Sequence, residues 1–268
     1  MSPALITGLP IRSVTATRYV TALREGGSLP GLVEADDDGL YVVKFRAAGQ
    51  GPKALIAELV GGEIGRALGL PVPEIVLVGL DAALGKAEPH QEIQDLLVRS
   101  AGLNLGLDFL PGALAFDPAA GTPPGMDLPD PDLAADVVWF DAFITNVDRT
   151  AKNVNLLVWH GRLWLIDHGA ALYVQHTWRD PAEHARRPFE RIADHVLLPH
   201  AASIVEADAR LAGRITEDVL GSIVEAIPEA WLGPDVAGER RAYVDYLLAR
   251  LAAPRSFVEE AERARRRA

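Results

Sequence analysis

The sequence predicts an α+β fold in two lobes, the first mostly β and the second mostly helical. Residues 12–46 alternate between β-favouring runs and turn residues, whereas residues 190–268 carry successive helical patterns. Between them, residues 116–132 are dominated by Pro, Gly and Asp, which is typical of an exposed loop. A chain of 268 residues can form two modest lobes with a cleft between them. We therefore expect a first lobe at residues 1–115 and a second at residues 116–268.

The first lobe is expected to combine a sheet with one main helix. Residues 52–70 carry apolar side chains at helical spacing, with Pro52 near the start and Gly69 near the end. Gly61 and Gly62 inside this helix each cost about 1 kcal/mol against alanine, so we expect close packing there. Residues 92–99 are expected to form a short helix or connector. Strands are predicted at residues 13–23, 32–35, 40–45, 74–80 and 103–110, the first three of them antiparallel.

The second lobe is expected to begin with a helix and a β-hairpin. The helix covers residues 133–145, and two short apolar strands within residues 155–166 turn at His160-Gly161. Residues 173–188, which carry His176, His184 and several arginines, are expected to form an irregular loop. Further helices are predicted at residues 191–198, 203–212, 217–227 and 238–251, the last running toward the C-terminus.

The composition excludes several classes of protein. A hydrophobic content of 49% is ample for a buried core, so general disorder is not expected. The chain has no cysteine, which excludes disulfides and thiol chemistry and suits a cytoplasmic protein. No run approaches the ~18 apolar residues of a membrane helix, so no membrane span is expected. The net charge of −11 argues against a nucleic-acid partner.

Three oxygen-bearing side chains lie beside apolar runs in residues 139–170. Asp148 and Asn153 are five residues apart in a polar loop, and Asp167 follows the second strand of the hairpin. A hairpin bounded in this way brings all three side chains to one edge. Phosphoryl transfer needs one carboxylate to orient or accept a proton and an Asn–Asp set to hold Mg²⁺. Asp and Asn are also common in ordinary turns, so loop composition alone leaves both interpretations open.

Lys44 interrupts the apolar strand predicted at residues 40–45. If its face of the sheet lines a cleft, the ammonium can meet phosphate oxygens. The alternative is a solvent-facing lysine that protects a sheet edge from aggregation. In the helix at residues 52–70, Glu63 falls within the apolar stripe and Glu58 on the opposite side. Periodicity alone therefore favours Glu63 as the buried partner of a lysine.

The order of these features resembles the protein-kinase-like fold: a strand lysine, a helix glutamate, a hinge strand, Asp-x-x-x-x-Asn and a later Asp. The segment NVDRTAKN at residues 146–153 resembles the catalytic loop of HipA-like kinases. It is also similar to that of type II phosphatidylinositol 4-kinases. LIDHG at residues 165–169 resembles their metal-binding segment, with His168 where protein kinases commonly have Phe. The resemblance covers roughly residues 15–200 and implies a bilobal protein-kinase-like fold.

The resemblance implies a role for each motif residue. Asp148 would be the catalytic aspartate, Lys152 a second catalytic residue in its loop, and Asn153 and Asp167 the Mg²⁺ ligands. It places the helix partner of the lysine at Glu58 rather than at Glu63, and the hinge at residues 109–112. The implied nucleotide-binding positions are Gly26, Gly27, Ser28, Lys44, Glu58, Phe109 and Leu110. The glycine-containing turn is shorter than the usual Gly-x-Gly-x-x-Gly, which departs from the kinase pattern.

We interpret the sequence as an ATP- and Mg²⁺-dependent phosphotransferase that acts on a hydroxyl of a protein or small molecule. Two alternatives use the same residues: a catalytically silent nucleotide-binding pseudokinase and a nucleotidyltransferase. HipA toxins are longer and work beside a DNA-binding antitoxin. Little precedes the first predicted strand here, so we do not expect the toxin function to transfer.

Overall fold

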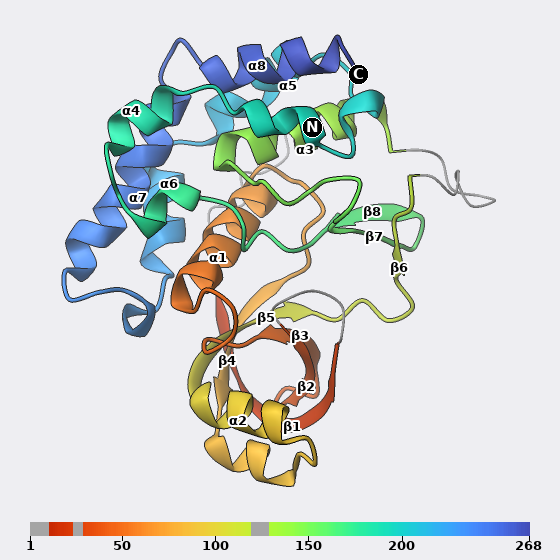
Figure 1. Cartoon of the computed structure of the whole chain (residues 1–268), viewed down its shortest axis with the longest axis vertical. Helices are drawn as coiled ribbons and strands as arrows, with labels where there is room; N and C mark the ends of the chain where they lie inside the picture. The colour runs from red at the N-terminus through yellow and green to blue at the C-terminus, as the bar shows by residue number, and fades with distance from the viewer. Residues whose placement is uncertain (1–10, 24–28, 119–128) are drawn as a thin grey trace.

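The computed structural model describes residues 11–23, 29–118 and 129–268. Its β-rich lobe is a closed barrel with strand order β1-β2-β3-β5-β4. Figure 1 shows this barrel at one end of the molecule and most helices at the other, with α1 standing between them. The barrel strands are β1 (Arg12–Ala22), β2 (Gly31–Ala35), β3 (Leu40–Lys44), β4 (Ile75–Leu80) and β5 (Gly102–Asp108).

The barrel closes through a parallel pairing that the sequence pattern did not predict. The strands pair antiparallel except β1 and β4, which run parallel from Arg12 opposite Val76 to Thr15 opposite Gly79. Parallel neighbours need a long crossover, and here it consists of β2, β3 and α1. Gly106 is required inside the barrel, because a Cβ there would lie 2.7 Å from Val78. The short segments η1 (Ala82–Ala87) and α2 (Gln91–Arg99) lie against the outer end of the barrel in Figure 1.

Helix α1 (Pro52–Ala67) begins with proline in its first turn, and Gly69 follows it in the left-handed region (φ 80°). Its residues from 55 to 62 are all buried, so it has no polar face along this half. Glycines let it approach its neighbours closely: a Cβ at Gly62 would lie 2.4 Å from Ile75, and one at Gly61 would lie 3.0 Å from His168 Cβ. The close packing expected at this glycine pair is therefore confirmed.

The helical lobe is built around α3 (Pro131–Ile144), which begins at the capping side chain of Asp130. Ten of its residues are buried, so it is a core helix. Trp139 stacks on Phe143 at 5.3 Å and meets the edge of Phe257 at 5.7 Å. The helices of this lobe are α4 (Pro181–Arg186), α5 (Ile204–Leu211), α6 (Glu217–Glu225), α7 (Val236–Leu251) and α8 (Ser256–Arg265).

A small sheet of order β6-β7-β8 completes this lobe. Its hairpin, β7 (Leu156–Trp159) and β8 (Arg162–Leu165), turns at His160 and Gly161 as predicted, and both turn residues have positive φ. The third strand, β6 (Leu114–Ala115), pairs with β7 and was not predicted. Single-turn 3₁₀ segments are η2 (Tyr173–His176), η3 (Glu190–Asp194), η4 (Leu198–His200), η5 (Ala212–Arg214) and η6 (Glu229–Trp231).

Two expectations for the helical lobe were wrong, and a third was confirmed. The helix predicted at residues 191–198 is two separate 3₁₀ turns, because Pro199 and short apolar runs favour compact turns over a helix. Residues 173–188 are not wholly irregular, since they contain η2 and α4. The helix predicted at residues 238–251 is confirmed as α7, which ends at Leu251, and α8 begins separately at Ser256 after a segment containing Pro254.

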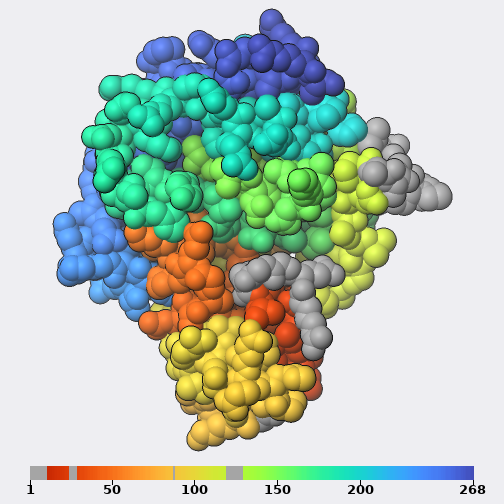
Figure 2. Space-filling view, in the orientation of Figure 1, coloured from red at the N-terminus to blue at the C-terminus, as the bar shows by residue number. Residues whose placement is uncertain are grey.

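Figure 2 shows a narrow β-rich end and a broader helical body, which together form the bilobal α+β shape that the sequence predicted. Within the described ranges, no helix is both long and apolar enough to cross a membrane.

Candidate active site

Lys44 joins the two lobes through a pair of ionic contacts. It ends β3, and its side chain is only 13% exposed. Its Nζ donates to Glu58 Oε2 of α1 at 2.6 Å and to Asp167 Oδ1 of the helical lobe at 2.5 Å. Lys44 is therefore not a solvent-facing edge lysine, and residues 44, 58 and 167 meet at one point although they are far apart in sequence.

The electrostatics favour the charged state of this cluster. Burial opposes ionisation of Glu58, but the Lys44 ammonium and His168 outweigh it and lower the pKa of Glu58 to about 2. Burial likewise opposes the Lys44 ammonium, yet Glu58 and Asp167 together raise the pKa of Lys44 above its usual value. Lys44 and Glu58 thus form a buried ion pair at neutral pH, with Asp167 as its partly exposed third member at 38% exposure.

The partner predicted from helical periodicity, Glu63, was wrong. Glu63 lies 3.5 Å from Arg66 on its own helix, whereas Glu58 is completely buried. Periodicity failed because nearly every residue around it on α1 is buried, so the helix has no single apolar stripe that marks the core. Burial raises the pKa of Glu63, which shows that its charge lacks the compensation that Glu58 receives.

His168 packs beside this cluster. It is fully buried, lies against Gly61 of α1 and meets the ring of Phe140 edge-on at 5.6 Å. Its Nδ1 is 3.5 Å from Glu58 Oε1, and neither ring nitrogen has a hydrogen-bond partner among the described residues. The ring therefore packs against α1 and Phe140 and also helps to lower the pKa of Glu58.

The predicted catalytic loop brings Asp148 and Asn153 together. Asn153 Nδ2 donates to Asp148 Oδ2 at 2.7 Å, and the backbones of Thr150 and Asn153 bond to each other in both directions. Asp148 itself is partly buried, and its carbonyl accepts from Asn155 Nδ2 at 2.9 Å. Lys152 is exposed at the tip of the loop. The five-residue spacing thus closes a compact turn in which the aspartate and asparagine side chains face each other.

A buried ionic network that sequence reasoning missed holds this loop. Asp141 on α3 accepts from Arg149 Nε at 2.6 Å and from His195 Nε2 at 2.9 Å, all three being buried. Burial opposes ionisation, but Arg149 and His195 outweigh it and hold the pKa of Asp141 well below its usual range. Arg149 also donates to the carbonyls of Asn155 and Ile166, on either side of the hairpin. The loop is therefore tied both to the core helix and to the segment that carries Asp167.

A second missed contact couples helix α1 to the segment after Asp167. Lys53 Nζ donates to the carbonyl of Gln175 at 2.7 Å, and Gln175 Nε2 donates back to the carbonyl of Lys53 at 3.0 Å. Tyr243 of α7 donates to Gln175 Oε1 at 2.7 Å. Gln175 is completely buried, so this clamp fixes the start of α1, and with it Glu58, to the helical lobe. No local sequence pattern marked Gln175, because its burial is apparent only in the structure.

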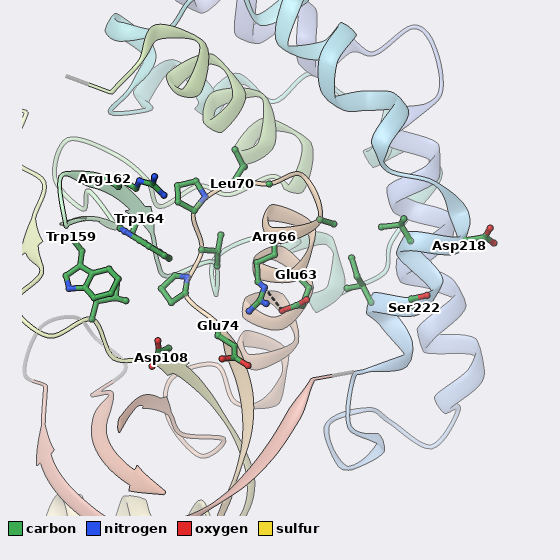
Figure 3. A pocket seen from close by; sticks show the side chains of 18 residues that line it. Glu63, Arg66, Leu70, Glu74, Asp108, Trp159, Arg162, Trp164, Asp218 and Ser222 are labelled. Atoms are coloured by element: carbon green, nitrogen blue, oxygen red, sulfur yellow. Dashed lines mark ion pairs between the residues drawn. The ribbon is translucent and has the colours of Figure 1, made fainter. Parts of the chain in front are cut away.

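The hinge and glycine positions are less informative. Phe109 is half-buried and donates its backbone N–H to Leu40 O at 3.0 Å. Leu110 is buried and lines a cavity of about 590 Å³ between the second half of α1, the β7–β8 hairpin and α6 (Figure 3). Neither Lys44 nor Asp148 lines this cavity. Gly26, Gly27 and Ser28, predicted as phosphate contacts, lie outside the described residues.

The residues present fit a divalent cation bound with a phosphate ligand. One ammonium, that of Lys44, is shared by the two carboxylates of Glu58 and Asp167, so this cluster carries excess negative charge. In the described part of the chain, no three His, Asp or Glu side chains form a ready-made metal cluster. Mg²⁺ keeps several waters and typically takes one or two protein ligands plus phosphate oxygens, which this sparse donor set matches.

Comparisons with known proteins agree with this geometry. The sequence model of the HipA-like kinases matches residues 17–254. The chain belongs to the HipA-like kinase family. The family resemblance and the kinase-like fold predicted from sequence are thereby confirmed. No curated protein matched the chain significantly.

A solved kinase structure shows the same fold at low sequence identity. The Helicobacter pylori proinflammatory kinase CtkA has a TM-score of 0.56 and 14% identity, covering 96% of this chain and 99% of its own. The Golgi casein kinase, solved with Mn and ADP bound, has a TM-score of 0.47 and 12% identity, covering 90% of this chain and 73% of its own. Family membership and the kinase fold together support a phosphotransferase.

Proposed function

We propose that this HipA-like kinase transfers the γ-phosphate of ATP, in the presence of Mg²⁺, to a hydroxyl of a protein or small molecule. The observation that carries the proposal is Lys44, held at once by Glu58 of α1 and by Asp167 of the helical lobe. A buried ion pair costs desolvation and is weak evidence for stability alone. A lysine kept charged at the junction of two lobes is well explained by the need to bind phosphate.

Each predicted residue then has a defined task. Lys44 would bind the nucleotide phosphates, and Glu58 would hold its ammonium in place. Asp167 and Asn153 would hold Mg²⁺, which neutralises negative charge on the phosphates when bound. Because Asn153 donates a hydrogen bond to Asp148, the proposed metal ligand and the proposed catalytic carboxylate lie within one turn of the chain. Gly26, Gly27 and Ser28 stay in the proposal as backbone contacts to phosphate.

Asp148 would orient the acceptor hydroxyl and take its proton as the oxygen attacks phosphorus. Its Oδ2 is held by Asn153, and within the described residues its Oδ1 makes no hydrogen bond. One oxygen thus fixes the carboxylate and the other is available to the acceptor. Lys152, exposed in the same loop, would meet the transferred phosphate.

We place the nucleotide between the two lobes, predicted from sequence as residues 1–115 and 116–268, with the hinge at 109–112 and the adenine beside Phe109. Because β6 (Leu114–Ala115) pairs with β7, the lobe boundary lies directly after this hinge. Leu110 lines the cavity shown in Figure 3, which is not lined by Lys44 or Asp148. Its contribution to adenine binding would therefore come from its backbone N–H.

The test incubates the purified protein with γ-labelled ATP and, separately, with α-labelled ATP, Mg²⁺ and hydroxyl acceptors that include the protein itself. Transfer of the γ-label alone is expected. Transfer of the α-label would instead identify a nucleotidyltransferase. ATP binding without transfer of either label would identify a nucleotide-binding pseudokinase and refute the proposal.

A further inference from the structure

A second cavity, of about 470 Å³, opens directly beside the proposed catalytic loop. Its walls come from the residues that precede Asp148 and from the segment around α4. We call it the acceptor groove, and its lining includes Thr145, Val147, Tyr173, His184, Arg250 and residues 187–191. In Figure 2 the catalytic loop (light green) and the α4 segment (blue-green) lie on the same face of the molecule.

The acceptor groove is basic in a chain whose net charge is −11. Its charged lining consists of Arg187, Arg191 and Arg250 against Glu190. Arg250 is 2% exposed and donates to the carbonyls of Ala142, Phe143 and Ala185. No carboxylate pairs with Arg250 among the described residues, so its charge is met by carbonyl dipoles.

The other two arginines are exposed, and each pairs only with an exposed carboxylate. Arg187 is 60% exposed and its partner Glu183 is 65% exposed, while Arg191 is 3.9 Å from the equally exposed Asp194. Exposed ion pairs of this kind contribute little to stability, so each arginine can exchange its carboxylate for an anionic ligand. Burial and the charges of Arg250 and Arg187 lower the pKa of His184, which is the effect expected of a positive field in the groove.

The groove also offers polar and aromatic contacts beside the reaction centre. Thr145, a polar lining residue, is 4% exposed. Tyr173 stands at the rim with 62% of its surface exposed. Val147 lines the groove and is the residue directly before Asp148, so the groove adjoins the proposed catalytic loop.

We propose that the acceptor groove binds an anionic side chain, Asp, Glu or a phosphorylated residue, of a protein segment whose Ser or Thr hydroxyl is placed at Asp148. This inference rests on the proposed phosphotransferase function. In the reaction the hydroxyl oxygen bonds to the γ-phosphorus, the bond to the β–γ bridging oxygen breaks to release ADP, and Asp148 takes the hydroxyl proton. A protein segment fits better than a metabolite, because pockets for metabolites usually enclose most of their ligand. The arginines and Tyr173 at this rim are instead mostly exposed.

The experiment measures transfer from γ-labelled ATP to matched peptides in which Ser or Thr is flanked by Glu, Gln or Lys. The groove variant is Arg187→Ala with Arg191→Ala. The control variant is Arg179→Ala with Arg186→Ala, which removes two exposed arginines from the same segment that do not line the groove. The melting temperature and its shift by Mg-ATP establish that each variant is folded.

We expect the wild type and the control to prefer the Glu peptides through a lower KM. In the groove variant, KM for these peptides should rise on the order of tenfold, the usual effect of losing a hydrogen bond to a charged group, with kcat little changed. Arg187→Glu with Arg191→Glu should shift the preference toward the Lys peptides. Equal use of Glu and Gln peptides by the wild type, or an equal loss in groove and control variants, would overturn the inference.

Two further arms separate this inference from the proposed function. Vesicles containing phosphatidylinositol test a lipid acceptor, and labelling of the lipid without labelling of any peptide would contradict a protein segment. If no acceptor is labelled, fluorescence anisotropy of the Glu and Gln peptides tests the groove directly. Selective binding of the Glu peptide by the wild type but not by the groove variant would uphold the groove while the phosphotransferase function fails. If the wild type does not bind the Glu peptide selectively either, both the acceptor groove and the phosphotransferase function are refuted.

Discussion

Replacing Glu58 with glutamine tests the central ion pair. The side chain keeps its shape but loses the charge that Lys44 contacts at 2.6 Å. The pKa of Glu58 is lowered from 4.5 to about 2, and at ~1.4 kcal/mol per pKa unit this corresponds to about 3 kcal/mol of stability. Removing one member of a buried ion pair typically costs a similar ~3–5 kcal/mol of stability. Because Lys44 keeps Asp167 as a second partner, we expect a loss at the lower end of this range.

Urea unfolding of wild type and Glu58→Gln at neutral pH measures this difference, and Glu63→Gln is the matched control on the same helix. Because burial raises the pKa of Glu63, removing its charge should leave stability unchanged or slightly higher. Since the pKa of Glu58 is lowered by folding, its contribution is complete above pH ~4.5 and is lost as the pH falls toward ~2. The gap between wild type and Glu58→Gln should therefore narrow over that acidic range. A loss below ~0.5 kcal/mol for Glu58→Gln, or an equal loss for Glu63→Gln, would refute the assigned pairing.

Three further predictions concern the nucleotide, the chemistry and the clamp. Mg-ATP at ~100 times its dissociation constant should stabilise the fold by about 2.7 kcal/mol and visibly raise Tm, and EDTA should remove most of the effect; an unchanged Tm would argue against a nucleotide site. In calorimetric titrations Asp148→Asn should keep ATP affinity within a few-fold while lowering transfer on the order of 10²–10⁴-fold, whereas Asp167→Asn should weaken Mg-ATP binding; full transfer by Asp148→Asn would remove its catalytic role. Gln175→Leu removes the bonds to Lys53 and Tyr243, so amide exchange should accelerate in α1 more than in α5 and transfer should slow; equal exchange in both helices would show that the clamp does not hold α1.

Local patterns in the sequence predicted most of the elements that frame the site. The strand ending at Lys44, the helix after Pro52, and the hairpin turning at His160 all appear close to their expected positions. These signals depend on neighbours in the chain, namely apolar alternation, helical spacing and turn residues. The family motifs at Asp148 and Asp167 are likewise contiguous, so the sequence displays them before any packing is known.

Contacts between distant segments were decided by the tertiary structure alone. Helical periodicity predicted Glu63 as the partner of Lys44, but the partner is Glu58. The prediction failed because α1 is buried on almost all sides, so apolar spacing does not mark its inward face. The parallel pairing of β1 with β4, the Asp141–Arg149–His195 network and the Gln175 clamp each join residues that no local pattern relates. The sequence by itself therefore determined the family, the order of elements and the candidate site residues. Which of them meet, and with what charge, depends on long-range packing, since burial and Coulomb interactions act through space rather than along the chain.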